Sequence, residues 1–139
     1  MGAEKAVTHN SPVPERELFS ALVYVVQQGK YEIGGLSNEL QDLLFKSGQT
    51  MMSFGHFFVA TVKADGPGSV LQLTVAGVPG APKALMDGWK NQKAGAALVE
   101  AVEEVLTAAN PPRPEPVQSF AVMQDGSTVP WTSGEFPGF

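Results

Sequence analysis

Two apolar runs on either side of a short turn constrain the fold of this chain more than any other feature. The first run covers residues 50–62 and holds three of the eight phenylalanines. Asp65-Gly66-Pro67-Gly68 then has the residue types of a turn, and the second run covers residues 69–75. The pattern predicts a β-hairpin with one buried and one wetter face. The buried face is predicted to carry Phe58, Ala60, Val62, Leu71, Leu73 and Val75.

Helical periodicity predicts the elements around this hairpin. One helix begins near Pro14 and ends at Gly29 in a left-handed cap. A second, of about three turns, begins at Ser37 and carries leucines with helical spacing, Leu36, Leu40, Leu43 and Leu44. A third lies within residues 83–109, where two glycines cost about 1 kcal/mol each. Short strands are expected within residues 117–123 and 128–131.

These elements predict an α+β fold. We expect a mostly antiparallel sheet of three to five strands, made of the central hairpin plus C-terminal strands, packed against two to four helices. Residues 1–13 are predicted to form a flexible N-terminal arm, and residues 14–110 the core domain. Residues 111–139 are predicted to be a Pro-rich spacer and an aromatic tail whose strands pack on the core or on a neighbour.

Composition limits the classes of function. The net charge of −5 makes nucleic acid an unlikely partner, because phosphate binding usually needs a basic patch. The chain has no cysteine, no apolar segment of the roughly 18 residues that a membrane span needs and no visible signal peptide. We therefore expect a cytoplasmic protein. Charged residues make up only 17%, which favours self-association, with a monomer as the alternative.

No motif points to catalysis. The two histidines, His9 and His56, lie far apart in the sequence and do not have the spacing of a metal site. We predict no catalytic residue, no metal and no cofactor, and an enzyme is the less favoured class. The alternative makes His56 a general base at the mouth of a pocket between the sheet and the helices, with Tyr24 as a second polar group.

Large aromatic side chains are the candidate binding residues, because such side chains dominate interface energy. The face of the hairpin that carries Phe57 needs a cover, either the chain's own aromatic tail or a second subunit or ligand. The residues predicted to bind a ligand or partner are Phe54, His56, Phe57, Trp131, Phe136 and Phe139.

Residues 95–102, Gly-Ala-Ala-Leu-Val-Glu-Ala-Val, follow the predicted strand pair. In this order of elements, residues 58–107 resemble the bacterial YbaB-type nucleoid proteins. That resemblance implies DNA binding, against which the acidic balance of the chain argues.

Three functions therefore stay open. The first is a non-enzymatic interaction protein, a homodimer or the partner of another protein, that associates through the hairpin and tail. The second is a small-ligand-binding protein or small enzyme with His56 in its pocket. The third is a YbaB-like nucleoid protein.

Overall fold

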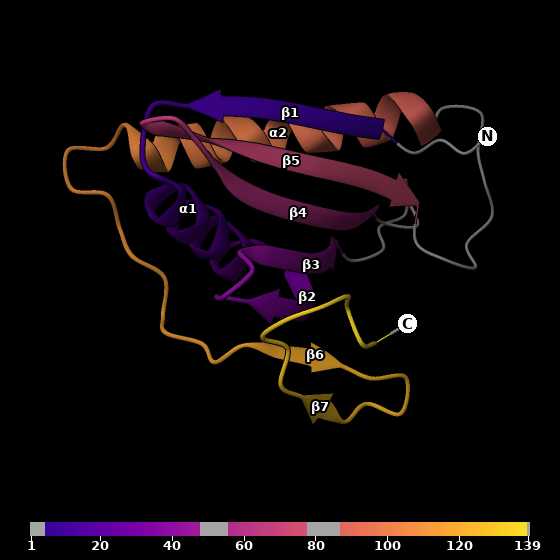
Figure 1. Ribbon diagram of the computed structural model, residues 1–139. Helices are drawn as coiled ribbons and strands as arrows, with labels where there is room; N and C mark the ends of the chain where they lie inside the picture. The colour runs from indigo at the N-terminus through magenta and orange to yellow at the C-terminus, as the bar shows by residue number, and fades with distance from the viewer. Residues whose placement is uncertain (1–4, 48–55, 78–86, 139) are drawn as a thin grey trace.

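The computed structural model describes residues 5–47, 56–77 and 87–138 and has an α+β fold, as predicted (Figure 1). Its elements in chain order are β1 (Lys5–Ser11), α1 (Glu15–Gln28), β2 (Tyr31–Ser37), β3 (Asp42–Ser47), β4 (His56–Asp65), β5 (Gly68–Gly77), α2 (Asp87–Leu106), β6 (Phe120–Val122) and β7 (Thr128–Val129).

The strands form one sheet in the order β1-β5-β4-β3-β2-β6-β7, and every neighbouring pair is antiparallel. Both helices pack on the same face of this sheet, and the buried core lies between the two layers (Figure 1). The prediction of a mostly antiparallel sheet packed against helices is confirmed. The prediction of three to five strands is wrong, since the sheet has seven in the described part of the chain.

One extra strand comes from the predicted arm. Residues 5–11 form β1, which pairs with β5 from Lys5↔Val75 to Ser11↔Ser69. Only Val7 and His9 in the middle of this strand are half-buried, while their neighbours are exposed. A strand with so few apolar contacts gives almost no periodic signal, because its order comes from the ladder it makes with β5.

Two more strands replace the predicted second helix. Residues 37–47 do not form a helix: they end β2, turn, and return as β3. In β3, Leu43 and Phe45 point to the helices and Leu44 points to the opposite face, yet all three are at most 4% exposed. A strand that is buried on both faces has a continuous apolar sequence. In this segment the leucines at positions 36, 40, 43 and 44 also have helical spacing, which led to the wrong prediction.

The central hairpin is confirmed. Strands β4 and β5 pair without interruption from His56↔Gly77 to Asp65↔Gly68, and the turn residue Gly66 has φ of +60°. The predicted buried face is buried, with every member at most 1% exposed: Phe58, Ala60, Val62, Leu71, Leu73 and Val75.

The first helix is confirmed, with a different ending from the predicted one. Pro14 precedes it in an extended conformation, and Glu15 and Glu17 lie in its first turn, where they favour the helix dipole. Gly29 follows the helix with φ of −88°, so the predicted left-handed cap is wrong. Glycine is needed there for space, since a Cβ would lie 2.6 Å from the ring of Tyr31.

The second described helix, α2, lies within the predicted range and contacts both β1 and β5. Gly95 explains how it approaches the sheet so closely. A Cβ on Gly95 would lie 3.1 Å from both Val7 and Val75, which is tighter than ordinary contact. The glycine therefore lets the helix axis sit near the strands at some cost in helix propensity. None of the described helices is long and apolar enough to cross a membrane.

Candidate functional site

The C-terminal tail covers part of the sheet face opposite the helices. Trp131, 3% exposed, packs with Leu44 of β3 and Ala121 of β6, and Phe57, Val59 and Phe136 surround this cluster. The cluster follows one row of paired residues across the sheet: Val59, Leu44, Gly35, Ala121 and Val129. The tail therefore supplies a cover for the hairpin face that the sequence predicted to need one.

The docked tail has a defined geometry. The rings of Trp131 and Phe136 meet edge to face with centroids 5.2 Å apart, and the Trp131 indole N–H donates to the carbonyl of Gly134 at 3.2 Å. A Cβ placed on Gly35 or on Gly138 would overlap the ring of Phe136. Two glycines thus make the slot that holds this ring against the sheet.

Beside the tail lies a cavity of about 210 Å³. Phe57, Phe136 and Met123 line it, and the ion pair between Glu32 and Lys46, at 3.1 Å, stands at its rim. Three of the predicted binding residues, Phe57, Trp131 and Phe136, therefore lie together on this outer face. Phe54 and Phe139 lie outside the described residues.

His56 is separate from these aromatics. It begins β4 on the helix side of the sheet, where its Nδ1 lies 2.7 Å from Oδ1 of the buried Asn91 in α2. Its backbone N–H donates to the Ser47 hydroxyl at 2.8 Å. Because Asn91 is buried, its contact with Nδ1 ties the ring of His56 to α2. His56 does not line the cavity beside the tail.

A stiff segment crosses the molecule on the side of α1. Residues 111–117, which we call the proline strap, contain four prolines and run from the end of α2 past α1 to β6 (Figure 1). Gln27 of α1 holds the strap with both halves of its side-chain amide: Nε2 donates to the carbonyl of Glu115 at 3.0 Å, and Oε1 accepts from the Glu115 N–H at 2.9 Å.

The turn between β2 and β3 holds the other end of the strap. The Asn38 side chain donates to the carbonyl of Val117 at 2.7 Å, and the Asn38 N–H donates to the Ser119 hydroxyl at 2.8 Å. Ser119 in turn donates to the carboxylate of Glu39, and this bond holds the pKa of Glu39 below its ordinary value. The strap is therefore fixed at two points.

Between the strap, the first half of α1 and the β2–β3 turn lies the strap groove, with a volume of about 490 Å³. Apolar side chains, Phe19, Val23, Leu36, Pro114, Pro116 and Val117, line part of it. The polar lining residues are Glu15, Arg16, Ser20, Asn38, Glu39, Gln41 and Glu115. Gln41 donates to Glu15 at 2.8 Å, which orients that carboxylate.

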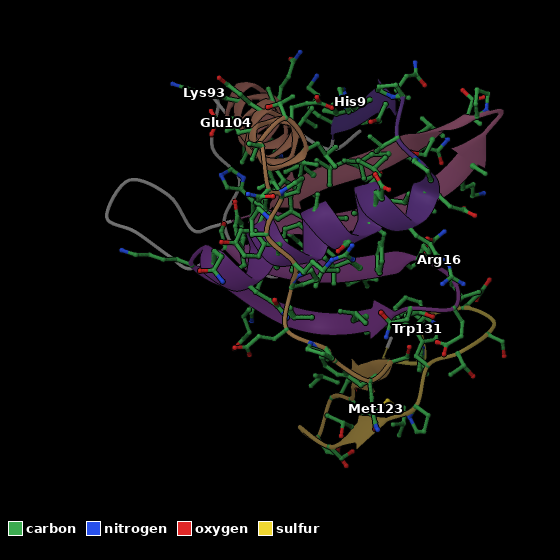
Figure 2. All side chains as sticks on the ribbon, turned by 90° about the vertical axis from the view of Figure 1, so that its left-hand side faces the viewer. His9, Arg16, Lys93, Glu104, Met123 and Trp131 are labelled. Carbon is green, nitrogen blue, oxygen red and sulfur yellow. The ribbon has the colours of Figure 1, made fainter. Side chains whose placement is uncertain are left out.

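The charges of the strap groove are unequal: three glutamates, Glu15, Glu39 and Glu115, face one arginine, Arg16 (labelled in Figure 2). A neighbouring cavity of about 300 Å³ shares Arg16 and Ser20 with the groove and extends under the start of the strap to Arg113. The groove itself contains no histidine. Across the residues that the structure describes, no group of three or more His, Cys, Asp or Glu side chains could hold a metal ion.

Sequence reasoning did not find the strap groove. Its walls come from three segments, around residues 15–23, 36–41 and 114–117, that are distant in the chain and share no motif. The four prolines predicted an extended spacer, and its position against α1 depends on Gln27 and Asn38, which look like ordinary surface residues.

Comparison with known proteins shows the fold and no family. No family model matches the sequence, and no curated protein matches it significantly. The structure is similar to the crystal structure of Ara h 8.0201, with a TM-score of 0.55 and 14% identity over 73% of this chain and 94% of the other. It is also similar to DynU16, from the dynemicin biosynthetic locus, with a TM-score of 0.53 and 17% identity over 91% of this chain.

These neighbours have folds of the Bet v 1-like and polyketide-cyclase type. The chain spans only 56% of the length of DynU16. At such identities the likeness is one of fold.

Proposed function

We propose that this chain is a non-catalytic binding protein that holds a small amphipathic organic cation in the strap groove. The observation that carries the proposal is the groove itself, a concave site of about 490 Å³ in which prolines of the strap lie beside three carboxylates and one guanidinium. The similarity to small proteins of the Bet v 1-like fold type is consistent with this class of function.

The size and lining of the groove define the class of ligand. Ligand pockets typically enclose about 300–1,000 Å³ and combine apolar walls with a few polar groups that fix orientation. Phe19, Val23 and Leu36 are at most 6% exposed, so the apolar surface open to a ligand comes mainly from Pro114, Pro116 and Val117 of the strap. The excess of carboxylates favours a positively charged group on the ligand and disfavours an anion, as does the net charge of −5 on the whole chain.

The strap makes the site preorganised. Its backbone is bonded to Gln27 at one end and to Asn38 at the other, and its prolines restrict its conformation further. A wall that is ordered before binding loses little entropy when the ligand enters.

Calorimetry with two matched probes tests the proposal. Naphthylmethylamine and naphthoate share the same ring system and carry opposite charges. We expect the amine to bind at one site per chain and the carboxylate to bind much more weakly or not at all. Equal binding of both probes, or of neither, contradicts the proposal.

Two glutamate variants locate the site. Glu39→Gln keeps an oxygen that can accept from Ser119 but removes the charge, so it should weaken amine binding several-fold. Glu104→Gln makes the same change on the exposed side of α2 and should leave binding unchanged. An equal effect of the two variants would place the amine outside the strap groove.

Of the functions predicted from the sequence, the small-ligand-binding alternative agrees with the fold of the structural neighbours, and self-association has less support. Association through the hairpin and tail needs free aromatic side chains, whereas Trp131 and Phe136 pack on the chain's own sheet. Among the described residues, the partners of His56 are Asn91 and Ser47, and a ligand pocket at His56 stays a prediction. Partner binding by the aromatic residues, nucleoid binding and a cytoplasmic location stay predictions.

A further inference from the structure

Both arginines of the chain line one cavity. Arg16 lies in the first turn of α1 and Arg113 in the proline strap, far apart in the sequence, and the chain contains no other arginine. The cavity is the one of about 300 Å³ that lies beside the strap groove. Among the described residues, no ion pair involves either guanidinium. Two guanidinium groups free of such pairs at one concave site favour an anion.

The rest of the cavity lining suits a carboxylate on an apolar molecule. Val105, Leu106 and Pro112 are half-buried, so part of each apolar side chain is accessible at the cavity. Glu17 is the single carboxylate among the lining residues. The lining therefore has one positive charge in excess, which a carboxylate balances and a doubly charged phosphate exceeds. A planar carboxylate also matches the guanidinium fork with two parallel hydrogen bonds.

The cavity and the strap groove adjoin along one line of α1. Arg16 and Ser20 line both of them and lie about one helical turn apart. With about 3.6 residues per turn, Phe19 of the groove lies to one side of this line and Ala21 of the cavity to the other. The strap also lines both, with its first residues at the cavity and its last at the groove. The short side chain of Ser20 leaves room for one molecule to extend from one site into the other.

We propose that the ligand of the strap groove is a zwitterion, whose carboxylate binds at Arg16 and Arg113 while its ammonium group binds at the glutamates of the groove. This inference rests on the proposed function and deepens it, because it names a second charged group on the same ligand. The ligand then has an apolar body with opposite charges at its two ends. A carboxylate without the ammonium group gains nothing from the glutamates and is repelled by the net charge of −5, so it binds weakly.

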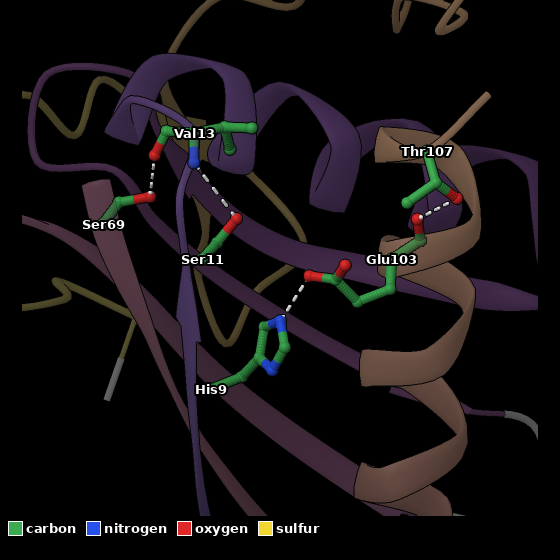
Figure 3. Close-up of polar contacts among 6 residues, drawn as sticks. All are labelled: His9, Ser11, Val13, Ser69, Glu103 and Thr107. Carbon is green, nitrogen blue, oxygen red and sulfur yellow. Dashed lines mark hydrogen bonds and ion pairs between the residues drawn. The ribbon is translucent and has the colours of Figure 1, made fainter. Parts of the chain in front are cut away.

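Polar contacts hold both helices that form the cavity (Figure 3). Just before α1, the Ser69 hydroxyl of β5 donates to the Val13 carbonyl at 2.7 Å. Near the end of α2, Glu103 pairs with His9 of β1, and the Thr107 hydroxyl donates to the Glu103 carbonyl at 2.9 Å. The sheet therefore fixes the start of α1 and the end of α2. A cavity whose walls are ordered before binding loses little entropy when the ligand enters.

Calorimetry with a matched pair of probes tests the inference. An aminomethylnaphthoate with its two groups at opposite ends of the ring system is a zwitterion, and the corresponding aminomethylnaphthamide has the same shape without the negative charge. We expect the zwitterion to bind roughly tenfold more tightly than the amide, because its carboxylate accepts charge-assisted hydrogen bonds. Binding of both probes with equal affinity overturns this inference alone. Failure of both probes and of naphthylmethylamine to bind overturns the proposed function as well.

Two variants locate the carboxylate of the ligand. Arg113 lines the cavity but not the strap groove. Arg113→Gln should therefore remove the advantage of the zwitterion and leave the affinity for naphthylmethylamine unchanged. Lys5→Gln removes the same charge from the exposed start of β1 and is the matched control. An advantage that persists in Arg113→Gln, or that is lost equally in Lys5→Gln, overturns the inference. Circular dichroism shows that each variant keeps the fold.

The arginine side chains give a second readout that does not depend on affinity. Because the chain has two arginines, the Nε–H region of its nuclear magnetic resonance spectrum should hold two signals. The Arg113 signal is the one that disappears in Arg113→Gln. It should move when the zwitterion is added and hardly move with the amide. An Arg113 signal that stays in place at saturating zwitterion overturns the inference.

Discussion

At the scale of single residues, Gly35 decides whether the tail can dock. A side chain at this position would overlap the ring of Phe136. We expect Gly35→Val to displace Phe136, loosen Trp131 and lower the free energy of unfolding by about 2 kcal/mol, in the range for overpacking. Gly34→Val is the control, since a Cβ there meets only the Leu44 carbonyl oxygen, at 3.9 Å. Tryptophan emission should shift to the red in Gly35→Val and hardly change in the control.

Asp42 is a residue whose charge opposes folding. Its Oδ1 is buried and has no hydrogen-bond partner in the structure. Burial raises the pKa of Asp42, while Thr61 and Lys63 act more weakly in the opposite direction. The folded state therefore holds this proton more tightly than the unfolded chain, and stability falls as the pH rises through the window between the two pKa values.

Replacing this charge should stabilise the protein. We expect Asp42→Asn to raise the free energy of unfolding at pH 7 by up to about 1 kcal/mol. The gain should shrink as the pH falls through the window between the folded and unfolded pKa values of Asp42, because the carboxyl group becomes protonated there. Asp65→Asn, in the exposed hairpin turn, is the control. Urea denaturation at several pH values measures both. A gain that is independent of pH, or a loss at pH 7, would show that the Asp42 charge is not the cause.

At the scale of elements, the proline strap depends on the Gln27 amide. Gln27→Ala removes both bonds to the Glu115 backbone and should cost about 1–2 kcal/mol if the whole strap loosens. Gln28→Ala changes the exposed neighbouring residue and should cost little. Hydrogen exchange read by mass spectrometry should increase in residues 111–119 of Gln27→Ala alone. Unchanged hydrogen exchange in residues 111–119 would mean that the prolines order the strap without the hydrogen bonds from Gln27.

The elements differ in how far the sequence could define them. The hairpin of β4 and β5 and both helices were predictable, because each has one buried face and a clear period. The β2–β3 hairpin was not, since Leu43, Leu44 and Phe45 are buried on two faces at once. Strand β1 was missed for the opposite reason, as its order comes from β5 and not from its own apolar residues.

At the scale of the molecule, the tail protects the outer face of the sheet. Deleting residues 131–139 should expose Leu44 and Ala121, now at most 4% exposed, and increase the binding of an apolar dye such as ANS. Trp131→Ala in the full chain should act in the same direction and cost about 3 kcal/mol. Unchanged dye binding after the deletion would show that the tail contributes no essential cover.

The candidate site was less predictable than the fold. The sequence indicated that Trp131 and Phe136 needed a partner surface, and the chain's own sheet provides one. It could not indicate the strap groove, because that site exists only once α1, the β2–β3 turn and residues 114–117 are brought together. The three-part division of the chain into arm, core domain and tail stays a prediction.

The most direct test of the account is a nuclear magnetic resonance titration of the isotope-labelled protein with naphthylmethylamine. The account predicts that the amide signals that move belong to the first half of α1, residues 36–41 and residues 114–117, which surround the strap groove. Shifts confined to the outer face around Phe57 and Phe136, or to the surroundings of His56, would contradict it.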